Sequence, residues 1–110
     1  MLPRSLRIAR EHFNGVFRSA RVYRGTALSL YAKPSQELGF AVVVAKKILK
    51  HAVDRHRTKR VVMSSVEGLL PFPLKAPHTF VFRLIKKPES EDVLRREVES
   101  LITKALSDLC

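Results

Sequence analysis

The chain has 110 residues, of which 45% are hydrophobic, enough for one modest core and for a single domain spanning residues 1–110. Its 21 Lys and Arg side chains outnumber its 10 Asp and Glu, and the net charge of +11 favours a polyanionic partner, nucleic acid before an anionic membrane surface. The single cysteine, Cys110, excludes a disulfide framework and a cysteine-based zinc site, and the lack of a long apolar stretch predicts a cytoplasmic protein that neither spans a membrane nor is secreted.

The charge is spread unevenly along the chain. Residues 1–60 contain 14 basic and 3 acidic side chains, whereas residues 61–110 contain 7 of each. We therefore expect the first part to face the polyanion and the second part to serve as scaffold. A merely solvated basic surface is the alternative, although solubility alone does not require such asymmetry.

Apolar periodicity predicts one helix and two strands in the first half. Apolar residues recur at helical spacing over residues 10–22. They alternate with smaller or more polar residues over 26–33, which predicts a strand that Pro34 ends. The continuous, valine-rich run 38–45 is typical of a central strand covered on both faces. There is room for one further short strand near residues 23–25.

The second half predicts two helices around a strand. Residues 52–70 have one apolar face and one strongly cationic face, and a proline-rich connector follows them. Residues 79–85 alternate as a strand, and Ser90 is a good N-cap for a closing helix. Apolar residues recur at helical spacing from Leu94 to Leu109 and predict the core face of this helix. The fold class is therefore α+β, a small sheet of about four strands with three helices in the order αβββαβα.

The densest positive charge lies between residues 46 and 60. On the predicted helix, Arg55 and Lys59 are four residues apart, and so are His56 and Arg60, so the charges spread over one broad face. Each such like-charged pair costs roughly 0.2 to 0.5 kcal/mol, which is recovered when phosphates bind and counterions are released. The cluster indicates a nucleic acid, with a solvated helix or an acidic protein or membrane partner as alternatives. Its composition does not separate RNA from DNA.

The segment Ala-Val-Asp-Arg-His-Arg-Thr-Lys-Arg at 52–60, after Lys46 and Lys47, resembles the signature helix of the bacterial ribonuclease P protein family. That family has Arg-Asn-Arg followed by a basic pair. Further short motifs occur in the family's order and approximate spacing: Phe13-x-x-Val16-Phe17, Arg24-Gly25, Leu30-Tyr31 and Leu38-Gly39-Phe40. The resemblance is strong over residues 7–60 and lies only in the pattern of elements beyond Val61.

The resemblance implies an accessory subunit of an RNA enzyme that releases the 5′ leader of precursor tRNA by hydrolysing a phosphodiester bond. It implies that the signature helix joins two parallel strands in the rare left-handed sense. No side chain is expected to be catalytic, no metal is expected on protein residues alone, and Mg²⁺ is expected on the partner RNA. The implied partners are the catalytic RNA and the precursor tRNA leader, with no protein partner required.

Two sets of site residues follow from the resemblance. The helix would contact the catalytic RNA, and a cleft between the sheet and the first helix would hold the single-stranded leader on aromatic faces and cations. The expected contacts to the catalytic RNA are Lys50, Arg55, His56, Arg57, Lys59 and Arg60. The expected leader cleft comprises Phe13, Phe17, Tyr31, Lys46 and Lys47.

Three of these positions invite a different interpretation. His56 stands where the family usually has asparagine, so a role of that amide does not carry over, and we expect His56 to contact RNA more strongly when it is protonated. Phe13 and Phe17 are four residues apart on the predicted helix, a spacing that is ordinarily that of core residues.

Three rival functions remain open. A general RNA-binding protein, such as a ribosomal protein, would share the charge without needing an aromatic cleft. A DNA-binding regulator would use residues 52–70 as a recognition helix and would prefer duplex DNA. A protein nuclease would need clustered carboxylates or an acid–base set, yet residues 1–60 contain only Glu11, Glu37 and Asp54 as acids.

Overall fold

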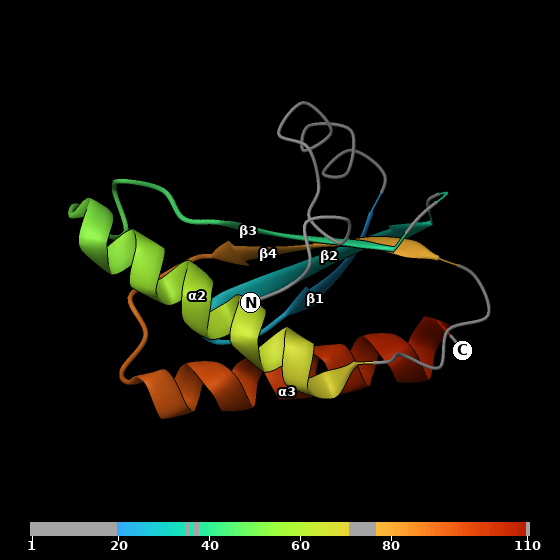
Figure 1. Ribbon diagram of the computed structural model, residues 1–110. Helices are drawn as coiled ribbons and strands as arrows, with labels where there is room; N and C mark the ends of the chain where they lie inside the picture. Colours follow the sequence, from blue (N-terminus) through green and yellow to red (C-terminus); the bar gives the residue numbers. More distant parts are fainter. Residues whose placement is uncertain (1–19, 35, 37, 71–76, 110) are drawn as a thin grey trace.

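The computed structural model describes residues 20–34, 36, 38–70 and 77–109. The sheet contains four strands: β1 (Arg21–Arg24), β2 (Leu28–Pro34), β3 (Gly39–Val43) and β4 (His78–Leu84). Their order across the sheet is β1-β2-β4-β3. The helices are α2 (Ala52–Leu69) and α3 (Glu91–Leu109), and both lie against the same face of the sheet (Figure 1).

The α+β class and the four-stranded sheet are confirmed, with two helices in the described part of the chain. Most of the predicted helix over 10–22 lies outside the described residues, so the third helix and the full αβββαβα order stay predictions. Its last two residues are a correction, because Arg21 and Val22 belong to β1. Val22 and Tyr23 have side chains that favour strands, and they pair with residues of β2.

The position of β3 is a second correction. Among the described strands it pairs only with β4, in parallel, so it is an edge strand and not the central strand that its apolar run predicted. Its first four residues are nevertheless buried. A strand is buried on both faces when other parts of the chain pack above and below it. This does not require a hydrogen-bonded strand on each side, so an edge strand can also be buried. Helix α2 links the two parallel strands, and the left-handed sense of this connection stays a prediction.

The main core lies between the sheet and the two helices. Every second residue of a strand points toward the helices, and these positions supply the large side chains of the core. Among them, the rings of Phe40 and Phe80 stack with their centroids 5.4 Å apart. Helix α2 contributes Thr58, Val61, Val62 and Val66, and α3 contributes Leu94, Val98, Leu101, Ile102 and Ala105. The core faces predicted for both helices are therefore confirmed. The N-cap is also confirmed, since the amide of Val93 donates to Ser90 Oγ at 3.2 Å.

A carboxylate of α3 holds the turn between β1 and β2. Glu97 Oε1 accepts hydrogen bonds from the backbone amides of Ala27 and Leu28, at 2.7 and 2.8 Å. A side chain at position 25 would collide with this carboxylate and would lie 2.9 Å from the carbonyl oxygen of Leu28. The close approach of α3 to the turn therefore explains Gly25.

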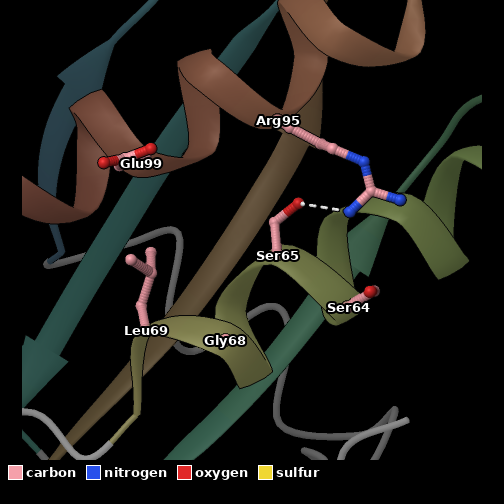
Figure 2. A pocket seen from close by; sticks show the side chains of 6 residues that line it. All are labelled: Ser64, Ser65, Gly68, Leu69, Arg95 and Glu99. Carbon is pink, nitrogen blue, oxygen red and sulfur yellow. Dashed lines mark hydrogen bonds between the residues drawn. The ribbon is translucent and has the colours of Figure 1, made fainter.

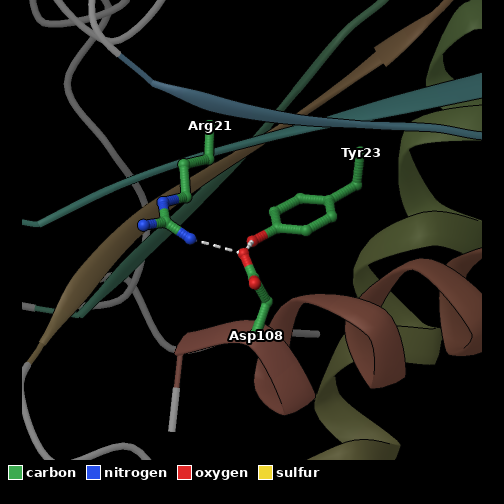
Figure 3. Close-up of polar contacts among 3 residues, drawn as sticks. All are labelled: Arg21, Tyr23 and Asp108. Atoms are coloured by element: carbon green, nitrogen blue, oxygen red, sulfur yellow. Dashed lines mark hydrogen bonds and ion pairs between the residues drawn. The ribbon is translucent and has the colours of Figure 1, made fainter.

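A second carboxylate of α3 fastens β1. Asp108 Oδ2 accepts hydrogen bonds from the Tyr23 hydroxyl and from Arg21 Nη1, each at 2.6 Å (Figure 3). The hydrogen bond from Tyr23, followed by that from Arg21, lowers the pKa of the Asp108 carboxyl. The last turn of α3 is thus connected to β1, the edge strand opposite β3.

Candidate nucleic-acid interface

The solvent side of α2 carries cations because its core positions repeat every three or four residues. His56, Arg57 and Arg60 are exposed, and Lys59 is half-buried. Within the described part of the chain, none of these four side chains takes part in a hydrogen bond or an ion pair. Their charge and hydrogen-bonding capacity are available to an external partner.

The cations of α2 spread over one broad solvent side of the helix, as the spacing predicted, with Arg57 and Lys59 toward its two edges. At roughly 100° per residue, Arg57 and Arg60 lie about 60° apart, whereas Lys59 lies about 160° from Arg57. Arg57 and Arg60 line a hollow beside α3. The structure therefore brings these two arginines together and directs Lys59 toward the opposite flank of the helix.

Arg55 has an internal role that the sequence did not reveal. Its side chain is half-buried, and Nη1 donates hydrogen bonds to the carbonyl oxygens of Leu49 and Lys50, at 3.0 and 2.8 Å. These bonds join the first turn of α2 to the loop before it. Arg55 thereby positions the backbone of Lys50, and its direct contact with RNA stays a prediction.

Lys46 and Lys47 lie on a tight turn between β3 and α2. The amides of Ile48 and Leu49 donate to the carbonyl oxygen of Ala45 at 3.0 and 3.2 Å. Leu49 is only 8% exposed and anchors the turn in the core, whereas both lysines are exposed. The turn consequently presents two ammonium groups to solvent from a packed base.

One end of the sheet gathers additional cations. β1, β3 and β4 all end there, and the cross-strand register aligns Arg24, Ser29, Arg83 and Val43 in one row. We call this the cationic end, and it comprises the exposed residues Arg24, Lys46, Lys47, Arg83, Lys86 and Lys87.

The cationic end includes residues that the sequence analysis missed. Arg83, Lys86 and Lys87 belong to residues 61–110, which the charge count assigned to scaffold, and the structure places them at the same end of the sheet as Arg24 and the lysine turn. Nothing in the residues around Arg24 indicates that it lies at the same end of the sheet as the lysine turn. The missing information was the strand order, because only the sheet places the ends of β1, β3 and β4 together.

Tyr31 lies on the face of the sheet opposite the helices. The register places it in a row with Val22, Val81 and Ala41. Ala41 and Val81 form a small buried cluster separate from the main core, and the half-buried Tyr31 packs against it. We call this surface the Tyr31 face. Because side chains alternate along a strand, Lys33 of β2 and Arg83 of β4 share it.

Part of the expected leader cleft lies outside the described residues. Phe13 and Phe17 belong to that part, so Tyr31 is the one expected aromatic residue whose place the structure gives. Across the described ranges, no group of three or more His, Cys, Asp or Glu side chains is arranged to hold a metal ion. No helix there is long and apolar enough to cross a membrane.

Comparison with known proteins identifies the family. The ribonuclease P family model matches residues 2–106. No curated protein sequence matches the chain significantly. The solved RNase P protein of Staphylococcus aureus is similar, with a TM-score of 0.80 and 14% identity over 93% of this chain and 96% of that chain.

The RNase P protein of Thermotoga maritima is also similar, with a TM-score of 0.73 and 17% identity over 89% of this chain and 96% of that chain. At these identities the solved structures show a shared fold, whereas the family match spans nearly the whole sequence. The chain therefore belongs to the ribonuclease P protein family, whose members are subunits of the ribonucleoprotein that matures the 5′ end of tRNA.

Proposed function

We propose that this chain is an accessory subunit and that the partner RNA, with Mg²⁺ bound to it, hydrolyses the bond between the 5′ leader and the tRNA. The observation that carries this proposal is a set of cationic side chains on α2, beside the cationic end of the sheet, that have no hydrogen bond or ion pair to any residue the structure describes. A surface of this kind binds phosphates and releases counterions. No further protein is required in this proposal.

The contact to the catalytic RNA is assigned to α2 and the loop before it. Arg57 and Arg60 offer planar forks for bidentate phosphate contacts, and Lys50 and Lys59 offer point charges. His56 is exposed beside them and offers a further polar contact. Arg55 acts mainly by holding the loop that carries Lys50.

The leader is assigned to the Tyr31 face and the adjoining lysine turn. A single strand places bases or sugars on an aromatic ring while cations follow its phosphates. Tyr31 supplies the ring, Arg83 supplies a cation on the same face, and Lys46 and Lys47 extend the positive charge beyond β3. This mode of binding tolerates many leader sequences, as a subunit that serves many tRNA precursors needs.

Cleavage of a precursor tRNA by a bacterial ribonuclease P RNA at low Mg²⁺ tests the subunit role. We expect the wild-type protein to stimulate cleavage and the Arg57→Ala, Arg60→Ala double variant to lose most of this effect, because two phosphate contacts are removed. The control is Arg96→Ala with Lys104→Ala, which removes equal charge from exposed positions of α3. A protein that binds a cognate RNA but never stimulates cleavage would instead be a general RNA-binding protein.

Leader dependence tests the Tyr31 face. We expect Tyr31→Ala to weaken binding of a precursor with a leader of several nucleotides, by roughly 1 to 3 kcal/mol for one lost stacking contact. Binding of a tRNA without a leader should be unchanged, and Tyr31→Phe should preserve the difference between the two substrates. Equal losses for both substrates would place the leader elsewhere.

A further inference from the structure

A continuous groove follows the seam between α2 and α3. Three adjoining hollows compose it, and each shares lining residues with the next: Arg57 and Glu91 line the first two, and Ser64 and Arg95 line the second and third. The groove begins beside Lys87 before α3 and continues to Gly68 near the end of α2. We call it the seam groove.

Positive charge dominates the middle of the seam groove. Arg57 and Arg60 of α2 and Arg95 of α3 line one hollow of about 310 Å³, with the hydroxyl of Ser64 and one carboxylate, that of Glu91. Three guanidinium groups against one carboxylate leave an excess of positive charge. Their mutual repulsion has a cost in the free protein that a bound anion would remove.

The three arginines have little internal use. Arg57 and Arg60 have no hydrogen bond or ion pair within the described ranges. Arg95 Nη1 reaches Ser65 Oγ at 3.5 Å, the long limit of a hydrogen bond (Figure 2). The Ser65 hydroxyl itself donates to the carbonyl oxygen of Val61 at 2.8 Å. Arg95 is therefore held only weakly across the groove.

Gly68 leaves the far part of the groove open. A glycine in a helix is about 1 kcal/mol less favourable than alanine, so a packing reason is expected. None exists on the protein side, because a Cβ at this position would meet no described atom within 4 Å other than its chain neighbours and the adjacent backbone of its own helix. Figure 2 shows Gly68 on the last turn of α2, near Ser64 and Ser65. A glycine at such a place permits the backbone of a ligand to approach closely.

We propose that the seam groove binds a sugar-phosphate strand of the catalytic RNA, so that α3 contributes Arg95 to the RNA interface. This inference rests on the proposed function. Phosphates bind between the arginines of the two helices, and the strand continues past Gly68. The first hollow carries the carboxylates of Asp54 and Glu91 beside Arg57 and Lys87, and Lys87 joins it to the cationic end. A long RNA strand can follow both surfaces, which a short acidic peptide cannot, so this continuity favours RNA.

The affinity of a bacterial ribonuclease P RNA for the full-length protein, measured across a range of KCl concentrations, tests this proposal. Arg95→Ala is compared with Arg96→Ala, because Arg96 is its exposed neighbour with the same charge and lines none of the three hollows. We expect Arg95→Ala to lower the slope of log K against log salt by about 0.7 to 0.9, the value for one phosphate contact. The slope of Arg96→Ala should be that of the wild type.

Gly68→Ala tests the course of the strand. Because alanine favours helix, this variant should be at least as resistant to urea as the wild type, yet it should bind the RNA several-fold more weakly. Unchanged RNA binding by Gly68→Ala would overturn a path past this residue. The stability measurement ensures that a loss of binding is not a loss of folding.

Failure of this inference is distinguishable from failure of the proposed function. Equal effects of Arg95→Ala and Arg96→Ala, in a protein that still binds the RNA and stimulates cleavage, would overturn the seam groove alone. A wild-type protein that does neither would overturn the proposed function. Binding of polyglutamate that Arg95→Ala abolishes, with unchanged RNA affinity, would assign the groove to an acidic protein and so overturn an RNA strand there.

Discussion

The two helices cover the same face of the sheet and have nearly equal lengths of 18 and 19 residues, yet they use their charged side chains differently. In α3, Glu97 and Asp108 bind groups of the chain itself, at the turn before β2 and on β1. In α2, Arg57 and Arg60 have no partner in the described part of the chain. Helix α3 thus fastens the sheet, and α2 presents charge to a partner.

Net charge alone therefore does not locate a binding surface on these helices. A charged side chain that already holds a backbone amide or a neighbouring strand contributes to folding, and one without an internal partner is available for binding. Arg55 is the exception within α2, because its guanidinium binds the carbonyl oxygens of Leu49 and Lys50. Substitutions that separate stability from RNA affinity test whether the two helices divide these roles.

The largest expected loss of stability comes from Glu97. Glu97→Ala leaves the amides of Ala27 and Leu28 without their acceptor, and we expect the free energy of unfolding to fall by about 2 kcal/mol. Urea denaturation monitored by circular dichroism measures the change. Glu99→Ala, at an exposed position of the same helix, should change it by less than about 0.5 kcal/mol. Equal losses for the two variants would contradict the fastening role.

An intermediate effect is expected at Arg55. Because Arg55→Ala removes two hydrogen bonds to carbonyl oxygens, it should lower the free energy of unfolding by about 1 kcal/mol and also weaken RNA binding through the displaced lysine loop. Arg57→Ala should weaken RNA binding and leave urea stability unchanged. If both variants affect only RNA binding, Arg55 belongs with the externally directed cations.

The smallest effect is expected at Asp108, and it depends on pH. The folded-state pKa of this carboxyl lies below the unfolded value, so its contribution is fully present above about pH 4 and is lost as the pH falls through the folded-state pKa. Asp108→Asn should therefore be slightly less stable than the wild type at pH 7, and the difference should shrink in acid. Thermal unfolding at pH 7 and pH 3 measures it. A difference independent of pH would contradict a role for the charge.

Much of the scaffold was predictable because its signals are local. The alternation around Leu30 and Phe82 predicted two strands, and the spacing from Leu94 to Ala105 predicted the buried face of α3. The edge position of β3 was not predictable, because an apolar run reports burial and not hydrogen-bonded neighbours. The first residues of β1 were assigned to a helix because the apolar pattern of the preceding segment was extended too far.

Local residue patterns were enough to show how the charge is distributed along the chain, which faces of its helices are apolar, and which family the motif at 52–60 indicates. Only the tertiary structure decided that Arg55 is directed to the loop carbonyls, that Arg83 joins the lysine turn at one end of the sheet, and that Arg95 shares a groove with α2. The physical reason is that these contacts depend on strand order and helix packing. Glu97 and Ala27 illustrate this dependence, since they are 70 residues apart in the chain and meet only when α3 packs against the sheet.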